Sequence, residues 1–298
     1  MCFVTWDVMK RFASCLVASA MACGPRDRVV ALELNAIPEL EPFSSPVLVA
    51  GLLDATDLAQ DPWLSADERE IYFASDKLGS YDIWRSTRST ADAEWQPATV
   101  VEELSTDAAD LEPAIASDGL TAYFASDRAG PQSGFHIWLS RRAMGSDPWG
   151  PPQPLDLGTS ATDRGPTLDS SDRILVFASD RGMRDLDLYL ATRSDETQSF
   201  NVPAPLKEIN SPTFDWDPGL YDAGLSLAFA SRRDGDHTTS HLYETRRTSI
   251  DAQFGVPRPL VELNSSHTEG DPWLSESGRH VVFSSDKDGF SRLYEAWR

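Results

Sequence analysis

The sequence predicts an all-β fold, a five-bladed β-propeller of four-stranded antiparallel blades. Three observations predict it: a unit of about fifty residues recurs five times, each copy holds signals for four short strands, and the two ends of the repeat region carry complementary parts of one unit. A period this constant indicates one supersecondary unit copied along the chain.

The recurring unit is centred on a short apolar run that reads YFASDK in the first copy. Its phenylalanine returns at intervals of 51, 53, 52 and 54 residues, and a proline precedes it at the same spacings. The phenylalanines are Phe73, Phe124, Phe177, Phe229 and Phe283, and the prolines are Pro62, Pro113, Pro166, Pro218 and Pro272. The propeller is expected over residues 43–298, with repeats near 61–111, 112–164, 165–216, 217–270, and 271–298 plus 43–60.

Each copy contains four strand signals in a fixed order. The segment after the proline ends in turn residues such as Ser117–Gly119, and an alternating apolar run follows, so these two segments form a hairpin. A third run, such as Tyr81–Trp84, is rich in aromatic and β-branched residues. An aromatic residue and a proline, such as Trp95 and Pro97, lead the fourth run. A proline suits an outer edge strand because its missing N–H needs no partner there.

The two ends of the repeat region predict how the ring closes. The fifth copy reaches Arg298 without a fourth strand, and the segment Phe43–Leu53 has the fourth-strand pattern without a blade in front of it. We expect this N-terminal strand to complete the last blade, because an open ring would leave unpaired strand edges at its seam. A six-bladed or incompletely closed ring is the alternative.

The N-terminal region has the build of an export signal. Lys10 and Arg11 precede an apolar stretch that ends in small residues before Cys23, so residues 1–22 are interpreted as a signal peptide. Met9 is a second candidate for the initiator, because the charges follow it directly.

Cys23 is the predicted site of lipid attachment. All three cysteines lie within the first 23 residues, so the exported domain contains no thiol and no disulfide. Residues 23–42 are then a lipid-anchored tether. Ordinary secretory cleavage at the same place, which would give a secreted protein, is the alternative.

The formal net charge of −21 restricts the partners. A surface this acidic repels nucleic-acid backbones, so nucleic acid is excluded as a partner. Basic protein faces, cations and neutral glycans remain. No segment after the signal is apolar enough to span a membrane. We therefore expect membrane contact only through the lipid anchor, and a monomeric propeller.

The repeat resembles a known family, the TolB-type, WD-repeat-like β-propeller repeat of bacterial envelope proteins. The shared features are a proline-led strand, an Asp-Gly turn, a strand end of the form F-x-S-x-R and a D-I-Y strand, and they cover residues 61–298. The resemblance implies an exported protein of the periplasm or the outer membrane. The family includes scaffold proteins, domains fused to peptidoglycan-binding modules and gating domains of peptidases, so the resemblance implies the fold more narrowly than the function.

Acidic residues stand at two fixed positions before the prolines. One residue ahead lie Asp61, Glu112, Asp217 and Asp271, with Gly165 in the third copy, and three residues ahead lie Asp110, Asp163, Asp215 and Glu269. We expect both sets to pair with the bases that follow the second strand and so to tie neighbouring blades together. Those bases are Lys77, Arg128, Arg181, Arg233 and Lys287. The alternative is that the first set converges on Ca²⁺ at the channel mouth. No other cofactor is expected.

Binding residues are expected where the five copies differ, because the shared residues build the scaffold. Candidates on the rim and in its longer loops are Arg164, Trp216, Arg232, His136, His237 and His241. Trp63 and Trp273 follow the prolines of the first and last copies. These two residues pack between blades or, alternatively, form an aromatic platform for a sugar ring or a peptide side chain.

Two sequence motifs of hydrolases, G-x-S-x-G and H-E-x-x-H, are missing. We therefore interpret the chain as a noncatalytic binding or scaffold protein of the bacterial cell envelope, which presents one propeller rim to an envelope protein or a glycan. A glycan-acting hydrolase of the five-bladed propeller type is the alternative, because such enzymes need only a few nonequivalent carboxylates around one sugar.

Overall fold

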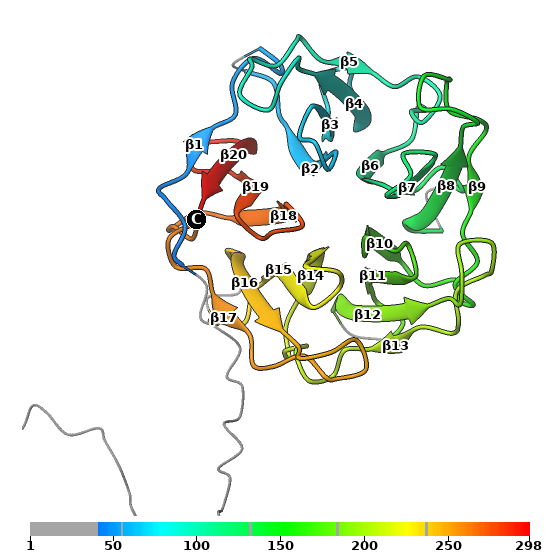
Figure 1. Ribbon diagram of the computed structural model, residues 1–298, viewed down its shortest axis with the longest axis vertical. Coiled ribbons are helices and arrows are strands. Elements are labelled where there is room, and N and C mark those ends of the chain that lie inside the picture. Colours follow the sequence, from blue (N-terminus) through cyan, green and yellow to red (C-terminus); the bar gives the residue numbers. More distant parts are fainter. Residues whose placement is uncertain (1–40, 55, 131–132, 183–184, 236–237) are drawn as a thin grey trace, which may run out of the picture. The chain divides into compact units, whose positions relative to one another are not determined.

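The computed structural model describes residues 41–298, except residues 55, 131–132, 183–184 and 236–237. Five four-stranded antiparallel sheets stand around a central axis as the blades of a β-propeller (Figure 1). The predicted fold class and the count of five blades are confirmed, and the six-bladed alternative is wrong. The described part contains no helix that could span a membrane.

The strands run from the axis outward in the order in which they occur along the chain. The inner strands are β2 (Gln60–Leu64), β6 (Asp110–Ile115), β10 (Asp163–Leu168), β14 (Asp215–Tyr221) and β18 (Glu269–Leu274). The second strands are β3 (Glu70–Ser75), β7 (Thr121–Ser126), β11 (Ile174–Ser179), β15 (Ser226–Ser231) and β19 (His280–Ser285). The third strands are β4 (Asp82–Thr87), β8 (His136–Arg141), β12 (Asp187–Thr192), β16 (His241–Arg246) and β20 (Arg292–Trp297). The outer strands are β5 (Thr99–Val100), β9 (Gln153–Pro154), β13 (Ala204–Pro205), β17 (Arg258–Pro259) and β1 (Val47–Leu48).

The ring closes through its first strand. β1 pairs antiparallel with β20, with Val47 opposite Glu295, and so becomes the outer strand of blade 5. Backbone hydrogen bonds from Ser44 N to Trp297 O (2.7 Å) and from Val49 N to Leu293 O (2.9 Å) extend this pairing on both sides. The predicted closure by an N-terminal strand is confirmed.

The core lies between the blades. The five repeat phenylalanines are at most 1% exposed, and the second strands are buried along nearly their whole length. Each second strand has a neighbouring blade on both of its faces, so both faces are apolar, unlike a sheet with one side in water. Burial of these strands supplies most of the hydrophobic stabilisation that holds one blade against the next.

An arginine at the end of each third strand contacts both the turn between the first two strands and the aromatic residue that precedes the outer strand. In blade 1, Arg88 Nε donates to Glu68 O (2.6 Å), and the guanidinium lies 4.1 Å from the ring centre of Trp95. The corresponding pairs are Arg142 with Trp149, Arg193 with Phe200, Arg247 with Phe254 and Arg298 with Phe43. The last pair joins the two ends of the described chain, so blade 5 is built like the other four.

Each inner strand contains a β-bulge just ahead of its proline. The pairing with the second strand skips two residues there, as between Gln60 and Trp63 in blade 1. The residue before the proline has a positive φ in every blade: Asp61 (56°), Glu112 (56°), Gly165 (61°), Asp217 (48°) and Asp271 (53°). The bulge explains why a proline is tolerated in an inner strand, because the skipped residues need no ladder hydrogen bond.

Candidate functional site

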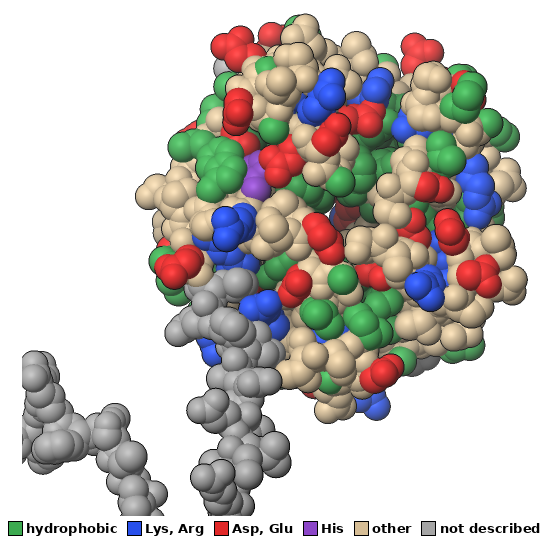
Figure 2. Space-filling model, in the orientation of Figure 1, with side chains coloured by type: hydrophobic (Ala, Val, Ile, Leu, Met, Phe, Trp, Pro, Cys, Tyr) green, Lys and Arg blue, Asp and Glu red, His purple; other side chains and the backbone are tan. Residues whose placement is uncertain are grey.

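A central cavity of about 380 Å³ runs along the propeller axis, and its walls come from all five inner strands. We call the side on which the second strands end the loop side, and the side with the β2–β3 type of turn the hairpin side. The cavity extends from the bulge residues near the loop side to turn residues on the hairpin side, such as Ala66, Asp118 and Glu276, which are exposed. Seen down the axis, the molecule is hollowed at its centre, and hydrophobic and acidic side chains both lie around the hollow (Figure 2).

Four bulge carboxylates, the bulge ring, lie at the loop-side end of the cavity: Asp61, Glu112, Asp217 and Asp271. Because the bulge turns these residues out of the regular strand geometry, their side chains reach the backbone of the next blade. Asp271 Oδ2 accepts from Asp61 N (3.3 Å), and Asp61 Oδ2 accepts from Glu112 N (3.2 Å). Glu112 Oε2 accepts from Gly165 N (2.5 Å). The bulge ring therefore ties three blade interfaces together.

Arg164 is the cation that approaches the bulge ring. Its Nε donates to Glu112 Oε1 (2.6 Å), its Nη2 forms an ion pair with the same oxygen, and its guanidinium lies 5.1 Å from the ring centre of Phe135. Burial opposes its charge, but the Glu112 and Asp217 carboxylates raise the pKa of Arg164 above its ordinary value. Arg164 thus stays charged and compensates one carboxylate, while blade 3 itself carries Gly165 in the ring.

Two of the bulge carboxyl groups have raised pKa values. Burial first, and then the nearby Asp271 carboxylate, raises the pKa of Asp61 well above its ordinary value. The same two causes, in the same order, raise the pKa of Asp217. Asp271 shares a side-chain hydrogen bond with each of them. Like charges this close in a dry site cannot all be ionised together.

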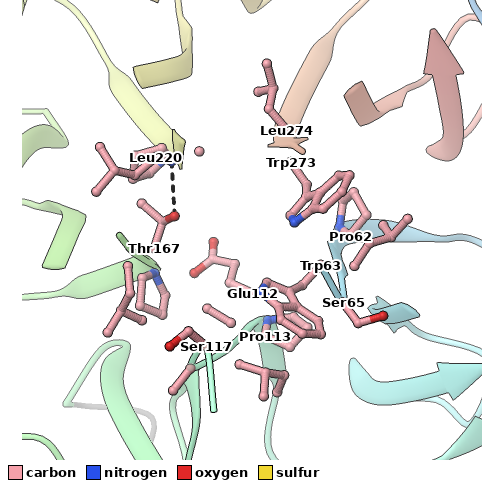
Figure 3. A pocket seen from close by; sticks show the side chains of 18 of the residues that line it. Pro62, Trp63, Ser65, Glu112, Pro113, Ser117, Thr167, Leu220, Trp273 and Leu274 are labelled. Atoms are coloured by element: carbon pink, nitrogen blue, oxygen red, sulfur yellow. Dashed lines mark hydrogen bonds between the residues drawn. The ribbon is translucent and has the colours of Figure 1, made fainter. Parts of the chain in front are cut away.

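Two tryptophans line the cavity beyond the bulge ring. Trp63 and Trp273 come from blades 1 and 5, which are neighbours in the closed ring, and Figure 3 shows both indoles beside the open centre. Trp63 meets the edge of Tyr72 at 6.0 Å between ring centres, and Trp273 meets the edge of His280 at 5.8 Å. Both are half-buried, so they pack between blades and also face the cavity. The hypothesis of an aromatic platform is compatible with these positions, although its function stays a prediction.

His280 supports Trp273 and bridges blades 5 and 1. Its Nδ1 lies 3.1 Å from Glu68 Oε2, its Nε2 lies 3.2 Å from Glu295 Oε2, and its ring stacks on Trp297 at 4.8 Å. Burial opposes its charge, but the hydrogen bonds to Glu295 and Glu68 raise the pKa of His280. Sequence reasoning missed this residue. Its departure from the repeat could have identified it, since the other four copies have Glu, Thr, Ile and Ser at the position of His280.

The expected pairs between carboxylates and bases form in three blades. Arg128 pairs with Asp110 (2.5 Å), Arg181 with Asp163 (2.7 Å) and Arg233 with Asp215 (2.6 Å). In the other two blades, Lys77 pairs instead with Asp54 and Asp57, and Lys287 lies over Tyr294.

Two details of that expectation are wrong. Each pair forms within one blade rather than between blades, and the arginine reaches the preceding connection only through a carbonyl, as from Arg128 Nη2 to Leu104 O (2.6 Å). The bulge ring does not contact these bases, because the left-handed backbone of residues such as Asp61 turns their side chains toward the axis.

The remaining candidates do not gather in the cavity. Arg232 lies over Phe214 and Trp216 at 5.3 and 5.2 Å, and these three residues form a cluster in blade 4. His241 lies 2.5 Å from Asp234 Oδ2 and 3.0 Å from Ser265 O. Other candidates include His136, which begins β8 and is half-buried, and His237 and Cys23, which lie outside the described residues.

A metal site is not evident among the residues that the structure describes, because none of their His, Cys, Asp and Glu side chains form a group of three or more able to hold an ion. Calcium binding by Asp61, Glu112, Asp217 and Asp271 stays a prediction. The oxygens of three of these carboxylates already accept backbone N–H groups.

No protein-family model matches the sequence, and no curated protein matches it. Solved structures resemble its fold. TolB from Acinetobacter baumannii aligns with a TM-score of 0.51 at 15% identity over 81% of this chain, and the chain spans only 54% of that protein's length. The catalytic domain of the GH62 α-L-arabinofuranosidase from Coprinopsis cinerea aligns with a TM-score of 0.58 at 12% identity, over 86% of this chain and 96% of that one.

A third similar structure is the α-L-arabinofuranosidase from Lactobacillus brevis, with a TM-score of 0.58 at 13% identity, over 84% of this chain and 94% of that one. At such identities the likeness shows the propeller fold alone, and the same fold is shared by TolB proteins and by glycoside hydrolases.

Proposed function

We propose that this protein is a noncatalytic binding protein of the bacterial cell envelope, and that its partner inserts a group into the central cavity from the hairpin side. The observation that carries the proposal is the cavity itself: it is lined by Trp63 and Trp273, and it reaches exposed turn residues on one side. Preformed concave sites with apolar walls and a few polar groups are typical of ligand binding.

The bulge ring supports a structural rather than a catalytic use of the carboxylates. A glycosidase needs one carboxyl group as acid and a second as base or nucleophile, with a sugar between them. Here Asp61 and Asp271 share a hydrogen bond, and Glu112 is engaged by Arg164 and by Gly165 N. These contacts occupy the bulge carboxyl groups in holding the blades together.

A glycan-acting hydrolase is the second candidate function. It is favoured by the convergence of carboxylates from four blades on one cavity and by the likeness to arabinofuranosidases. Assays with arabinan, arabinoxylan and xylotriose test it. We expect no release of sugars. Hydrolysis that disappears in the Glu112→Gln variant, while the variant still melts cooperatively, would replace our proposal with this one.

Site-specific photocrosslinking tests where the partner binds. A photoreactive amino acid at Ala66, an exposed turn residue on the hairpin side, should give a discrete crosslinked product in native envelopes. The matched control is the same amino acid at Asp288, which is exposed on the loop side. Products from position 288 in the absence of products from position 66 would contradict binding at the hairpin side.

We also propose that the protein is exported and anchored by lipid at Cys23. This proposal rests on the sequence of residues 1–23 and on the resemblance of the repeat to envelope proteins. The Cys23→Ala variant should be released from membranes into the soluble fraction on cell fractionation. Unchanged membrane association of the variant would refute lipid attachment at this residue.

A further inference from the structure

The charge of the cavity lining narrows the class of group that the cavity can accept, provided that the protein binds a ligand there as proposed above. The described residues that line it include nine acids and no lysine, arginine or histidine. The acids are Asp61, Glu70, Glu112, Asp118, Asp169, Asp172, Asp217, Asp271 and Glu276. An anionic ligand would be repelled, because a cleft lined by one sign of charge focuses the potential of that sign.

Two of these acids are compensated by arginines, Glu112 by Arg164 and Glu70 by Arg85. Others are fixed by local hydrogen bonds to neutral groups. Asp172 accepts from Ser117 N (3.0 Å) and Ser117 Oγ (2.7 Å), and Asp118 accepts from Leu120 N (2.7 Å). A backbone N–H supplies a dipole and no full positive charge. Burial raises the pKa of Asp61, Asp172 and Asp217, so the negative charge of the lining rests mainly on Asp118, Asp169, Asp271 and Glu276. The potential is available to an incoming cation from the hairpin side.

The walls of the cavity between the bulge ring and the turn acids of the hairpin side are apolar. Five prolines and the side chains of Leu64, Leu220 and Leu274 line this part of the cavity together with the two tryptophans. The hydroxyl of Thr167 already accepts a hydrogen bond from Leu220 N (3.1 Å; Figure 3). A polar sugar would find few donors here, whereas an aliphatic stem would bury apolar surface.

The two indoles add a preference for positive charge. The face of a tryptophan attracts an ammonium or guanidinium group, and the attraction increases when the cation is removed from water. Trp63 and Trp273 are held by edge contacts to Tyr72 and His280 and lie beside the open centre of the cavity (Figure 3). Charge, apolar walls and aromatic faces thus favour the same kind of group.

We propose that the cavity binds a cationic group on an apolar stem, an alkylammonium or guanidinium, which enters from the hairpin side and lies against Trp63 and Trp273. A lysine or arginine side chain of a protein partner and a free organic amine share this chemistry. A volume of about 380 Å³ is sufficient for one such group with its stem.

Calorimetric titration of the full-length chain in detergent tests the ligand class. The probes are the blocked peptide Gly-Gly-Lys-Gly-Gly and its counterpart with norleucine, which keeps the stem and lacks the charge. The lysine peptide should bind at least tenfold more tightly than the norleucine peptide. Competition by n-butylamine would show that a free amine suffices, and lysine-peptide binding without such competition would assign the site to a protein side chain.

Variants test the proposed position. Trp63→Leu and Trp273→Leu should each weaken binding of the lysine peptide by roughly tenfold, whereas Trp138→Leu, at a half-buried tryptophan outside the cavity lining, should not. Asp118→Asn combined with Glu276→Gln should weaken binding severalfold, because two lining charges are removed. All titrations are made below the melting temperature of each variant.

Two results would overturn the inference at different levels. Equal affinity for both peptides, or binding of xylotriose that depends on Trp63, would refute the cationic ligand and leave the proposed binding function intact. If none of these probes binds and position 66 gives no crosslinks, both the cationic ligand and the proposed binding function fail.

Discussion

The two ends of the central cavity are built from the same five strands but use their polar groups in different ways. At the loop side, three of the four carboxyl groups of the bulge ring are buried, and Asp271 is half-buried. Three of the four accept backbone N–H groups, and Asp217 shares a hydrogen bond with Asp271. At the hairpin side, Asp118 and Glu276 are exposed, and two indoles lie beside the open centre. Buried carboxylates with assigned partners indicate structure, whereas half-buried aromatic side chains that line an open cavity indicate a surface for binding.

The largest effect is expected from Glu112→Gln at the loop side. The substitution leaves the half-buried Arg164 without its closest counter-charge, and breaking such a pair should lower the free energy of unfolding by about 2–3 kcal/mol. Urea denaturation followed by tryptophan fluorescence measures the loss.

Two further variants control for this effect. The double variant Glu112→Gln/Arg164→Met should recover part of the loss, because the unpaired charge is removed. At the hairpin side, Glu70→Gln removes half of a partly exposed pair with Arg85 and should cost less than about 1 kcal/mol. Equal losses at Glu112 and Glu70 would contradict the contrast between the two ends.

His280→Gln should have the next largest effect, about 1.5–3 kcal/mol, because His280 donates to two carboxylates at the junction of blades 5 and 1. The pKa of His280 is raised, so its contribution is complete below pH of about 6.5 and is lost as the pH rises through its folded-state pKa.

The partners of His280 set the lower limit of this pH window. The hydrogen bond with His280 lowers the pKa of Glu68, so the stabilisation from this hydrogen bond is lost as the pH falls below about 4.5. Arg88 faces the same carboxylate. The difference in melting temperature between wild type and His280→Gln should therefore be largest between these limits. A difference that does not vary between pH 5 and pH 9 would count against the assignment.

Asp217→Asn should stabilise the protein at high pH. The pKa of Asp217 is raised, so ionisation opposes folding once the pH rises through the unfolded value of 3.8 and toward the folded-state value. Asparagine mimics the neutral acid and tolerates a positive φ. At pH 8 the melting temperature should rise by roughly 2–4 °C, with no gain at pH 3. A loss at pH 8 that becomes smaller at pH 3 would contradict a raised pKa of Asp217.

A small effect on stability is expected from Trp63→Phe at the hairpin side, below about 1.5 kcal/mol, because an aromatic ring still contacts Tyr72. Binding of the cationic probe should fall more than stability does. A loss above 3 kcal/mol in urea denaturation would place Trp63 among the residues that hold the blades together, and the two ends would then no longer differ.

Much of the fold could be predicted from the sequence because the same signals occur five times. Errors in reading one copy are corrected by the other four, and the incomplete fifth copy predicted the closing strand. The arginine–aromatic pair of blade 5 was harder to find, because Phe43 and Arg298 are at opposite ends of the described chain.

The bulge ring could not be predicted in the same way. An acid before a proline gives no sign of a left-handed backbone, since most residues ahead of proline are extended. The side chain of Asp61 was therefore expected at the rim, near the bases, and it lies at the axis instead. Bulges arise from how the inner strand fits the ring, which is a tertiary property. His280, in contrast, departs from the repeat and could have been found by the criterion that identified Arg164.

The pairing of β1 with β20 also bears on how the chain folds. Val47 and Glu295 belong to opposite ends of the propeller sequence, so their contact has the greatest sequence separation in the sheet network and carries the largest loop-closure entropy. Blades 1 to 4 can form from local hairpins as they are synthesised. Blade 5 must wait for both ends, and until then the outer edge of β20 is a free template for another chain. A kinetic trap for this protein is therefore a ring that lacks only β1, in which a second molecule donates the missing strand.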